Sequence, residues 1–496
     1  MISLRVAKFF ALILPLVLSA NSSSETEIKT ASEAEISRPV EIDAAVELKL
    51  ILESVAGFYP LLRSSKADVD VSRGGVRASL GAFDLRLRGR FEQDFTGYYE
   101  NSRLDTVLEK PLTALGSRVF AGYKRGEGDF AVYDGKAETN NSGEWRLGID
   151  FSLLRDSTVD RRRTDLNRAE AAQKIAELGY IESLISNQAK AAQAFYDWVA
   201  AGRKLKIFRS LLDTAEKRDE ILKKQVIRGE VARFDQKDNE RLVYARRSLL
   251  IAQERKLIET AYKLSLFYRD EKGMPRVLKE QDIPGHGLED VNPLSPALDS
   301  VIDESHPWYL ARPDLERLRL RIAQNDFEAD LQSNQLLPRF DIQLSTSKDI
   351  GQGSVTRRPQ ESIGAVVFEI PIQNRLAGGR LEAAKAQSIS LQAQFDFAKD
   401  RARATIKDAI YAIDKFRQRY EVAKSEQILA VDLERGEQKR FQQGASNLVF
   451  VNIREQQAAE AAAKLVDAHL DYHLILADLL QATSLNAFGD NKDKLF

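Results

Sequence analysis

The chain contains no cysteine, two methionines and four histidines among its 496 residues. Without cysteine it can form no disulfide, and a lipid-modified N-terminal cysteine after a signal segment is excluded. The sequence also has no Gly-x-Ser-x-Gly motif and no Walker-type phosphate-binding motif. Its many carboxylates are scattered over expected helix surfaces. We therefore predict no enzymatic activity and no cofactor.

Two of the few histidines have the spacing of a metal-binding pair. His469 and His473 lie four residues apart on an expected helix, so their side chains share one face. No cysteine or third histidine accompanies them, and Asp471 points to another side of the helix. We expect the pair to serve packing or hydrogen bonding, and we predict no metal site.

Charge and hydropathy limit the partners of the chain. The formal net charge of −1 provides no general attraction to nucleic acid or anionic lipid. Residues 1–20 have the form of a secretory signal peptide, with Arg5 and Lys8 before a short apolar core, and residues 21–46 predict a polar arm. No later segment approaches the length of apolar sequence that a membrane-spanning helix needs. If the chain spans a membrane, the spanning part must be a closed β-barrel.

Proline is absent between Pro111 and Pro275 and again after Pro371. In each of these stretches an apolar helical stripe continues for about 65–70 residues, reaches a glycine and reverses. The first helices are expected to begin near residues 158 and 380 and would each be about 100 Å long. The returning helices are expected over residues 233–268 and 447–483. The two turns between them read Arg228-Gly229-Glu230-Val231 and Gln443-Gly444-Ala445-Ser446.

Four segments alternate between apolar and polar residues, which predicts strands. They cover residues 83–95, 145–153, 340–345 and 366–372, and their apolar sides are rich in aromatic residues. A soluble sheet can alternate in this way, but its polar side would rarely carry so many full charges. The pattern favours a membrane barrel with a wet lumen, with Tyr98, Tyr99 and Trp145 as interface aromatics. Residues 100–143 are rich in glycine and asparagine, and we interpret them as a loop with some extra β-structure outside the membrane.

The order of these segments indicates a duplication. The unit is helix, strand, strand, long helix, turn and helix, and it occurs at residues 47–268 (repeat 1) and 308–484 (repeat 2). Residues 269–307 are rich in proline and glycine and predict an irregular connector, and residues 485–496 form a C-terminal tail. The predicted fold is therefore mainly α-helical, with a membrane β-barrel.

Four strands cannot close a barrel, because the smallest membrane barrels have eight. Open edges in lipid leave backbone groups unsatisfied at a cost of several kcal/mol each. The chain must then oligomerise, and three copies would supply 12 strands. The helices would pack side by side as a cylinder that continues the barrel, and the whole would be a hollow duct.

At this point the chain resembles the TolC family of outer-membrane export channels over about residues 47–484. The matching segments are Leu337-Pro338-Arg339-Phe340-Asp341, Val367-Phe368-Glu369-Ile370-Pro371-Ile372 followed by Gly378-Gly379-Arg380, Gly444-Ala445-Ser446-Asn447-Leu448, and Ala468-His469-Leu470-Asp471-Tyr472-His473 with Ala477-Asp478-Leu479. The resemblance implies a homotrimer with a 12-stranded β-barrel and a long periplasmic α-helical barrel in the outer membrane of a Gram-negative-type cell. It also implies service to a tripartite efflux pump or type I secretion system, with a periplasmic adaptor protein and an inner-membrane transporter as partners. No energy source is visible in the sequence, so the duct would be passive and gated.

The resemblance assigns roles to the two turns and the residues after them. The turn residues Arg228, Gly229, Glu230, Val231, Gln443, Gly444, Ala445 and Ser446 would dock the adaptor. Some family members narrow the periplasmic mouth with acidic residues six and nine positions after the second turn glycine, where this chain has Phe450 and Ile453. We expect these two residues to form an apolar ring, with charges from Asp235, Asp238, Arg233 and Arg454 around it. The alternative is that Phe450 packs in the core of its own hairpin.

Two other classes of protein remain open on this evidence. A secreted coiled-coil structural or adhesion protein would explain the signal peptide and the long helices, but not four strands with charged and aromatic sides. A periplasmic adaptor also carries a helical hairpin, although it has one hairpin with a small lipoyl-like domain rather than a duplicated unit.

Overall fold

The structure is a computed structural model that describes residues 46–134, 137–285, 312–357 and 359–484. These residues fall within the second of two units, Ala45–Phe496. The expected signal peptide (1–20), nearly all of the polar arm (21–46), the later part of the connector and the C-terminal tail (485–496) lie outside the described residues.

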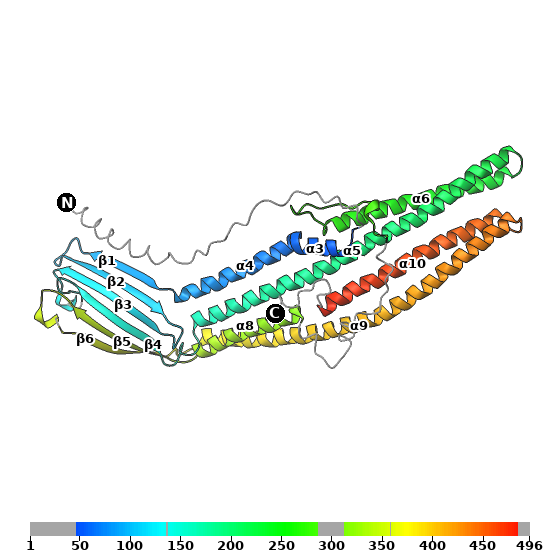
Figure 1. The fold of residues 1–496 in the computed structure, drawn as a ribbon. Coiled ribbons are helices and arrows are strands. Elements are labelled where there is room, and N and C mark those ends of the chain that lie inside the picture. The colour runs from blue at the N-terminus through cyan, green and yellow to red at the C-terminus, as the bar shows by residue number, and fades with distance from the viewer. Residues whose placement is uncertain (1–45, 135–136, 286–311, 358, 485–496) are drawn as a thin grey trace, which may run out of the picture. The chain divides into compact units, whose positions relative to one another are not determined.

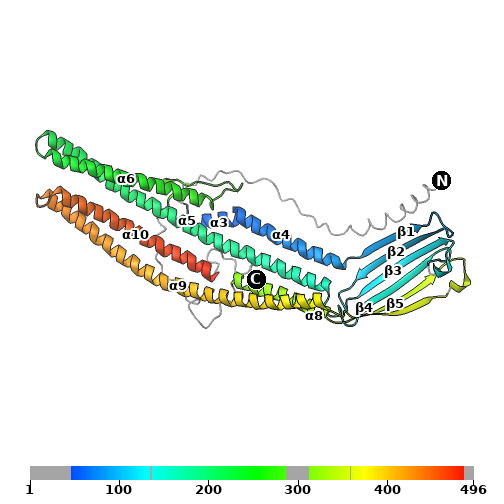
Figure 2. The same cartoon turned by 180° about the vertical axis from the view of Figure 1, so that it is seen from behind.

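Two long helical hairpins form most of the described chain (Figures 1 and 2). Helix α5 (Arg161–Ile227, 67 residues) turns into α6 (Arg233–Ser265), and α9 (Arg375–Gln442, 68 residues) turns into α10 (Leu448–Thr483). The expected lengths and returning helices are confirmed. Helix α9 begins five residues earlier than expected, because the pair Gly378-Gly379 lies inside its first turns and does not interrupt it.

Three shorter helices complete the helical layer. They are α3 (Leu48–Phe58), α4 (Pro60–Leu80) and α8 (Pro313–Gln335), and Pro60 stands at the first turn of α4, where the missing amide hydrogen costs nothing. Near the sheet the contacts run in the order α4, α5, α8 and α9, and toward the turns they run in the order α6, α5, α10 and α9. The layer is therefore four helices wide at both levels. Among the helices described, none is long and apolar enough to cross a membrane.

Among the described residues, the helices are held together by four apolar clusters, two of them large. The larger core joins α3, α5 and α6 through Ile51, Val55, Trp198, Leu205 and Leu264, all of them at most 1% exposed. A second core joins α9 and α10 and contains the residues Ile406, Ile413, Tyr472 and Leu479. Apolar burial on this scale fixes each returning helix against its long partner.

One antiparallel sheet of six strands follows the helices, in the order β1-β2-β3-β4-β5-β6. Its strands are β1 (Arg86–Gln93), β2 (Asn101–Pro111), β3 (Arg118–Gly128), β4 (Glu144–Ser152), β5 (Arg339–Asp349) and β6 (Glu361–Glu369). Short 3-10 turns occur at Gly81–Phe83, Val132–Asp134, Glu280–Asp282 and Val355–Arg357. The four predicted strands are confirmed as β1, β4, β5 and β6, although Ile370 and Ile372 lie beyond the end of β6.

The extra β-structure expected within residues 100–143 is present, but the interpretation of this segment as mainly a loop was wrong. They contain β2 and β3, two strands of 11 residues each in the interior of the sheet. Glycines inside the sheet make room for long side chains from neighbouring strands. A Cβ atom on Gly148 would lie 2.4 Å from the Phe120 ring, and one on Gly122 would lie 3.4 Å from the Arg146 guanidinium group. Repeat 1 therefore contributes four strands and repeat 2 contributes two, so the duplication is not symmetric.

Candidate functional site

One side of the sheet is apolar and exposed. The strand register places Leu87 opposite Leu108, and the apolar row continues through the pairs Ile149–Leu344 and Ile342–Val366. Large side chains on this side stay open to the surroundings, with Leu87 61%, Trp145 57% and Phe368 66% exposed. Tyr123 packs against Trp145 at a ring-centroid distance of 5.2 Å near the end of the sheet that is farther from the helices. An exposed apolar face of this size indicates a surface that is covered in the functional state.

The opposite side of the sheet carries a chain of ion pairs across four strands. Arg88 Nη2 on β1 lies 3.3 Å from Glu109 Oε1 on β2, and Glu109 Oε2 lies 3.2 Å from Arg118 Nη1 on β3. Arg118 then donates to Asp150 on β4, with Nε 3.1 Å from Oδ2. The charges that alternate with apolar residues in the sequence are thus neutralised in pairs on one face.

A second ion pair crosses a whole strand. Arg146 on β4 donates to Asp105 on β2 and passes over Gly122 of β3 on the way. A Cβ atom at residue 122 would already touch the guanidinium group at 3.4 Å, so a larger side chain there would press on the arginine. The contact joins β2 and β3 firmly to the rest of the sheet.

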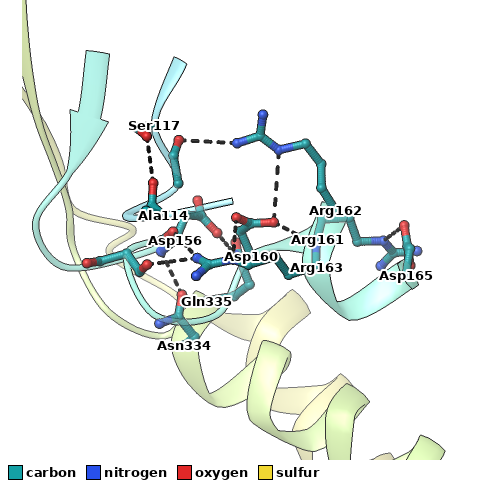
Figure 3. Close-up of polar contacts among 12 residues, drawn as sticks. Ala114, Ser117, Asp156, Asp160, Arg161, Arg162, Arg163, Asp165, Asn334 and Gln335 are labelled. Carbon is teal, nitrogen blue, oxygen red and sulfur yellow. Dashed lines mark hydrogen bonds and ion pairs between the residues drawn. The ribbon is translucent and has the colours of Figure 1, made fainter. Parts of the chain in front are cut away.

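A polar cluster fastens the sheet to the helices (Figure 3). Asp160 caps the start of α5, because its Oδ1 atom accepts a hydrogen bond of 2.9 Å from the Arg163 amide. Arg163 also donates to the carbonyl oxygens of Asp156 and Ser157, at 3.0 and 2.7 Å. The Asp156 amide donates to Asn334 Oδ1 at the end of α8, at 2.7 Å. The arginines at 161–163 therefore lie at the junction of sheet and helix.

Both hairpin turns have the same backbone design. Gly229 has φ of +76° and Gly444 has φ of +70°, a region that favours glycine. At the first turn the Glu230 amide donates to the Gln225 carbonyl oxygen at 3.0 Å, and the Gly229 amide donates to the Val226 carbonyl oxygen at 3.0 Å. The corresponding hydrogen bonds at the second turn are Ala445 to Arg440 and Gly444 to Phe441. This pair of bonds is the Schellman motif, which ends a helix by satisfying its last carbonyl groups.

The turns are open on their outer side. A Cβ atom on either glycine would meet no atom within 4 Å. Arg228, Glu230, Gln443 and Ala445 are exposed, while Val231 and Ser446 are half-buried, and Arg228 lies 3.9 Å from Glu230. The eight predicted docking residues thus stand at two free helix ends, with a polar surface that a partner can reach.

The predicted aperture residues lie on two separate helices. Phe450 and Ile453, which are 55% and 44% exposed, occupy the first turns of α10. Asp235 and Asp238 occupy the first turns of α6, where Asp238 Oδ1 lies 3.2 Å from Arg241. Helix α5 lies between α6 and α10, so a single copy does not bring the two pairs together.

The alternative role for Phe450, in the core of its own hairpin, does not fit its exposure. Its neighbour Val451 is 2% exposed and occupies the core position of that turn. Of the two basic residues expected around the ring, Arg454 donates to Gln457 at 2.9 Å and Arg233 is exposed at the start of α6.

A buried ionic cluster that we did not predict joins the two hairpins. Glu455 of α10 and Arg246 of α6 each have side chains that are 1% exposed, and Arg246 Nη2 lies 3.1 Å from Glu455 Oε2. Arg218 of α5 donates to the same Oε2 atom at 3.0 Å and to Asn452 Oδ1 at 2.6 Å. Arg246 Nη1 donates to the Leu211 carbonyl oxygen at 2.9 Å. One carboxylate is therefore held by two arginines from the other hairpin.

The electrostatics of this cluster extend to α9. Burial lowers the pKa of the Arg246 guanidinium group, while the charge of Glu455 opposes that change. Burial raises the pKa of Glu434 on α9, and the neighbouring Glu455 carboxylate raises it further. A sequence signal existed, because Arg246 and Glu455 both occupy positions in the apolar stripe of their helices, between Val243 and Leu250 and between Val451 and Ala458.

The two histidines on α10 have the packing role that we expected. The His469 ring stacks on Tyr420 of α9 at 4.3 Å between centroids, and the His473 ring stacks on Tyr196 of α5 at 4.4 Å. Both histidines are buried, so their spacing serves contacts with two neighbouring helices.

Together, the six-stranded sheet with one apolar and one charged side and the two long hairpins define an architecture that is shared with solved outer-membrane channels. Solved structures with this architecture include the MtrE outer membrane channel of Neisseria gonorrhoeae in its open state, with TM-score 0.62, 15% identity and coverage of 92% of this chain and 98% of that one. The outer membrane protein VceC of Vibrio cholerae matches with TM-score 0.61, 13% identity and coverage of 88% and 95%. The CmeC outer membrane channel of Campylobacter jejuni matches with TM-score 0.60, 12% identity and coverage of 93% and 94%.

No protein-family model and no curated protein matches the sequence. The chain nevertheless has the fold of the TolC-family outer-membrane channels, and the resemblance drawn from its motifs is confirmed at that level.

Proposed function

We propose that the chain is a subunit of an outer-membrane channel that projects into the periplasm of a Gram-negative-type cell. Three copies would form a passive, gated exit duct for a tripartite efflux pump or a type I secretion system. A periplasmic adaptor protein and an inner-membrane transporter would supply recruitment and energy. The fold shared with solved outer-membrane channels supports the class of protein.

The observation that carries the proposal is the sheet with two different sides. A sheet in water would cover its large apolar side chains with helices, yet Leu87, Trp145 and Phe368 remain more than half exposed. Lipid is the solvent that such a face fits, and the ion pairs on the other side fit a water-filled lumen. This combination argues against the secreted coiled-coil protein, which has no use for a charged and an aromatic face. The two hairpins joined to one sheet argue against an adaptor.

Association of copies is supported by the two edge helices. Helix α6 lies at one edge of the helix layer and carries exposed Tyr244, Ile251 and Ile258 at seven-residue spacing. Helix α9 lies at the other edge and carries exposed Ile389, Phe397, Tyr411, Val422, Leu429 and Leu433. Apolar positions repeated at this interval pack against a neighbouring long helix. Side-by-side copies would cover both stripes.

The roles of the hairpin ends remain part of the proposal. The exposed turns around Gly229 and Gly444 would dock the adaptor. In a closed ring of copies, Phe450 and Ile453 would face the axis and narrow the mouth, with Asp235, Asp238 and neighbouring arginines around them. The exposure of Phe450 and Ile453 in the single chain is compatible with this arrangement.

The test is to express the full chain, isolate the outer-membrane fraction and measure the native mass of the detergent-extracted protein, corrected for detergent. We expect a mass near three chains, and discrete conductance steps when the protein is added to a planar bilayer. A soluble monomer without conductance would overturn the proposal and favour the coiled-coil protein. A trimer that does not conduct would limit it to an assembly without a duct.

A further inference from the structure

We propose, on the basis of the proposed function, that the membrane barrel of this channel has eighteen strands and closes by pairing β1 of one copy with β6 of the next. The count of 12 rested on four strands for each copy. The described residues of each copy form six strands in one continuous sheet, so three copies supply eighteen. The additional strands are β2 and β3, which pair with each other over all their residues, while β2 pairs with β1 at residues 102–109 and β3 pairs with β4 at residues 118–124.

Strands β1 and β6 are the open edges of the sheet. Nearly all residues of both strands are exposed, whereas the four strands between them are mostly half-buried or buried. In lipid an open edge would leave a row of backbone groups without hydrogen bonds, which membrane proteins avoid by closing the sheet. Each edge therefore requires a partner strand when the apolar side is in a membrane.

The two edge strands match in chain direction and in the side of the sheet that carries their apolar side chains. Strand β1 runs away from the helices and β6 runs back toward them, so side by side they continue the antiparallel pattern. Their apolar sides align as well, with Leu87 and Phe91 on β1 and Val366 and Phe368 on β6. Since side chains alternate between faces, a match of faces is a strong constraint on pairing.

The charged sides of the two edges are complementary at the end near the helices. Arg86 on β1 and Glu369 on β6 are both exposed on that side, and neither has an ion-pair partner within the described part of one copy. All other things being equal, opposite charges on neighbouring strands stabilise the pair by up to about 1 kcal/mol. The partner that this seam recognises is thus a second copy of the same chain.

The edges of the helix layer coincide with the edges of the sheet. Strand β1 follows α4. Helix α4 lies on the same edge of the helix layer as α6 but nearer the sheet, and β6 leads into α9 at the other edge (Figures 1 and 2). A seam that pairs β1 with β6 therefore also brings the exposed apolar stripes of α6 and α9 toward each other. The same contact surface extends from the sheet to the turns.

The widths of the two layers support eighteen strands. Six strands about 4.8 Å apart, tilted by about 40°, cover an arc of roughly 38 Å, whereas four strands would cover roughly 25 Å. Four helices abreast at about 10 Å spacing cover roughly 40 Å. The six-stranded sheet and the helix layer therefore fit the same sector of a ring without a step between them.

The consequence for transport is a wide membrane section. Barrel diameter rises roughly in proportion to strand number, so eighteen strands give a diameter about 1.5 times that of 12, in the range where a barrel encloses a water-filled channel. The face that would line this channel carries paired charges such as Arg118 with Asp150. Hydrated polar cargo would pass this section, and the narrowest point would lie elsewhere along the duct.

Disulfide cross-linking tests the seam directly, because the chain has no cysteine of its own. A fixed Val366→Cys on β6 is combined in turn with Leu87→Cys, Gly89→Cys or Phe91→Cys on the same face of β1. At least one combination should give covalent dimers and trimers on oxidation in outer membranes. Val366→Cys with Arg88→Cys is the matched control, since Arg88 faces the other side and should not cross-link.

Electron microscopy of the detergent-extracted particle measures the strand count independently. The barrel should be about 1.5 times as wide as that of a variant lacking residues 98–141, which removes β2 and β3 and leaves a hairpin of β1 and β4. If that variant fails to fold, the strands of the intact channel can still be counted. Intramolecular cross-links alone, or a trimer with a 12-stranded barrel, would overturn the inference and leave the proposed function intact. Absence of any trimer would overturn the proposed function as well.

Discussion

Arg246 Nη2 on α6 lies 3.1 Å from Glu455 Oε2 on α10, and both side chains are 1% exposed although they belong to different hairpins. Such a pair loses most of its hydration on folding and gives little net stability by itself. Its importance is that removal of one partner leaves the other charge buried and unpaired. The pair therefore fixes the position of one hairpin against the other.

Replacement of Glu455 should destabilise the helical layer strongly. Glu455→Gln leaves Arg246 and Arg218 without a counter-charge, and loss of one partner of a buried pair costs about 3–5 kcal/mol. Chemical denaturation followed by circular dichroism measures the loss. The control is Glu460→Gln, an exposed residue five positions further along α10 that accepts a hydrogen bond from Gln456, and it should change stability by less than about 0.5 kcal/mol. Equal effects of the two substitutions would contradict a special role for Glu455.

Glu434 should make the helices more stable as the pH falls. Burial and Glu455 raise its pKa above the ordinary value of 4.5, so its ionisation opposes folding at pH 7. This penalty disappears as the pH falls through the raised pKa toward 4.5. Glu434→Gln should therefore stabilise the protein at pH 7, with a gain that shrinks in that range. Melting temperatures measured between pH 4.5 and 8 test this, and Glu382→Gln on an exposed turn of α9 should show no such trend.

The turn glycines should resist substitution for a reason that involves the backbone alone. At Gly229 or Gly444 an added Cβ meets no neighbouring atom, but the positive φ costs an L-residue about 1–2 kcal/mol. Gly229→Ala should thus speed hydrogen exchange at the first turn. Gly436→Ala, at an open site inside α9, should instead slow local exchange, because alanine favours a helix by about 0.5–1 kcal/mol over glycine. Changes of the same sign at both sites would refute this explanation.

Because the Arg146 side chain crosses β3 at Gly122, we predict that a larger side chain at residue 122 destabilises the sheet. Gly122→Val would push the arginine away from Asp105, and such overpacking typically costs about 1–3 kcal/mol. Gly89→Val, on β1, places the same side chain where nothing lies within 4 Å. We expect only the variant at residue 122 to lower the temperature at which the sheet unfolds in detergent. A larger effect at Gly89 would show that the crossing is unimportant.

The aperture proposal predicts a specific change in conductance. Phe450→Ala should raise single-channel conductance, since it removes bulk from the expected ring. Val449 precedes Phe450 on the same turn and is also 55% exposed, but it points in a different direction. Val449→Ala should leave conductance unchanged. Unaltered conductance in the Phe450 variant would end the gate hypothesis, and an equal rise in both would indicate a general loosening of the helix end.

Elements with a long, regular period were predictable from the sequence. The stripes of α5 and α9 and the alternation of β1 and β4 persist over many residues, so local pattern and tertiary environment agree. The hairpin turns were predictable because Gly229 and Gly444 interrupt stripes that resume on the far side. In these elements the pattern of neighbouring residues in the chain is enough to predict the secondary structure.

Features that depend on contacts between distant segments were not predictable in the same way. Strands β2 and β3 also place apolar residues, such as Val107 and Phe120, on the charged side of the sheet, and Gly122 of β3 makes room for Arg146 of β4. Glu455 and Arg246 could be noticed as charges in apolar stripes, but nothing in the sequence showed that they meet or that Arg218 joins them. The sequence of one copy likewise contains no signal for what covers its edges.

The unbroken helices also have a mechanical consequence. Each of α5 and α9, at 67 and 68 residues, is a lever about 100 Å long, whereas the helices beside them are divided into shorter pieces. A tilt of only about 5° at the sheet junction would move the far end by roughly 9 Å, by the geometry of a rod of that length. The polar cluster of Asp160 and Arg163 lies at the end of α5 that joins the sheet. Small rearrangements in this cluster would therefore be magnified into large displacements at the turn.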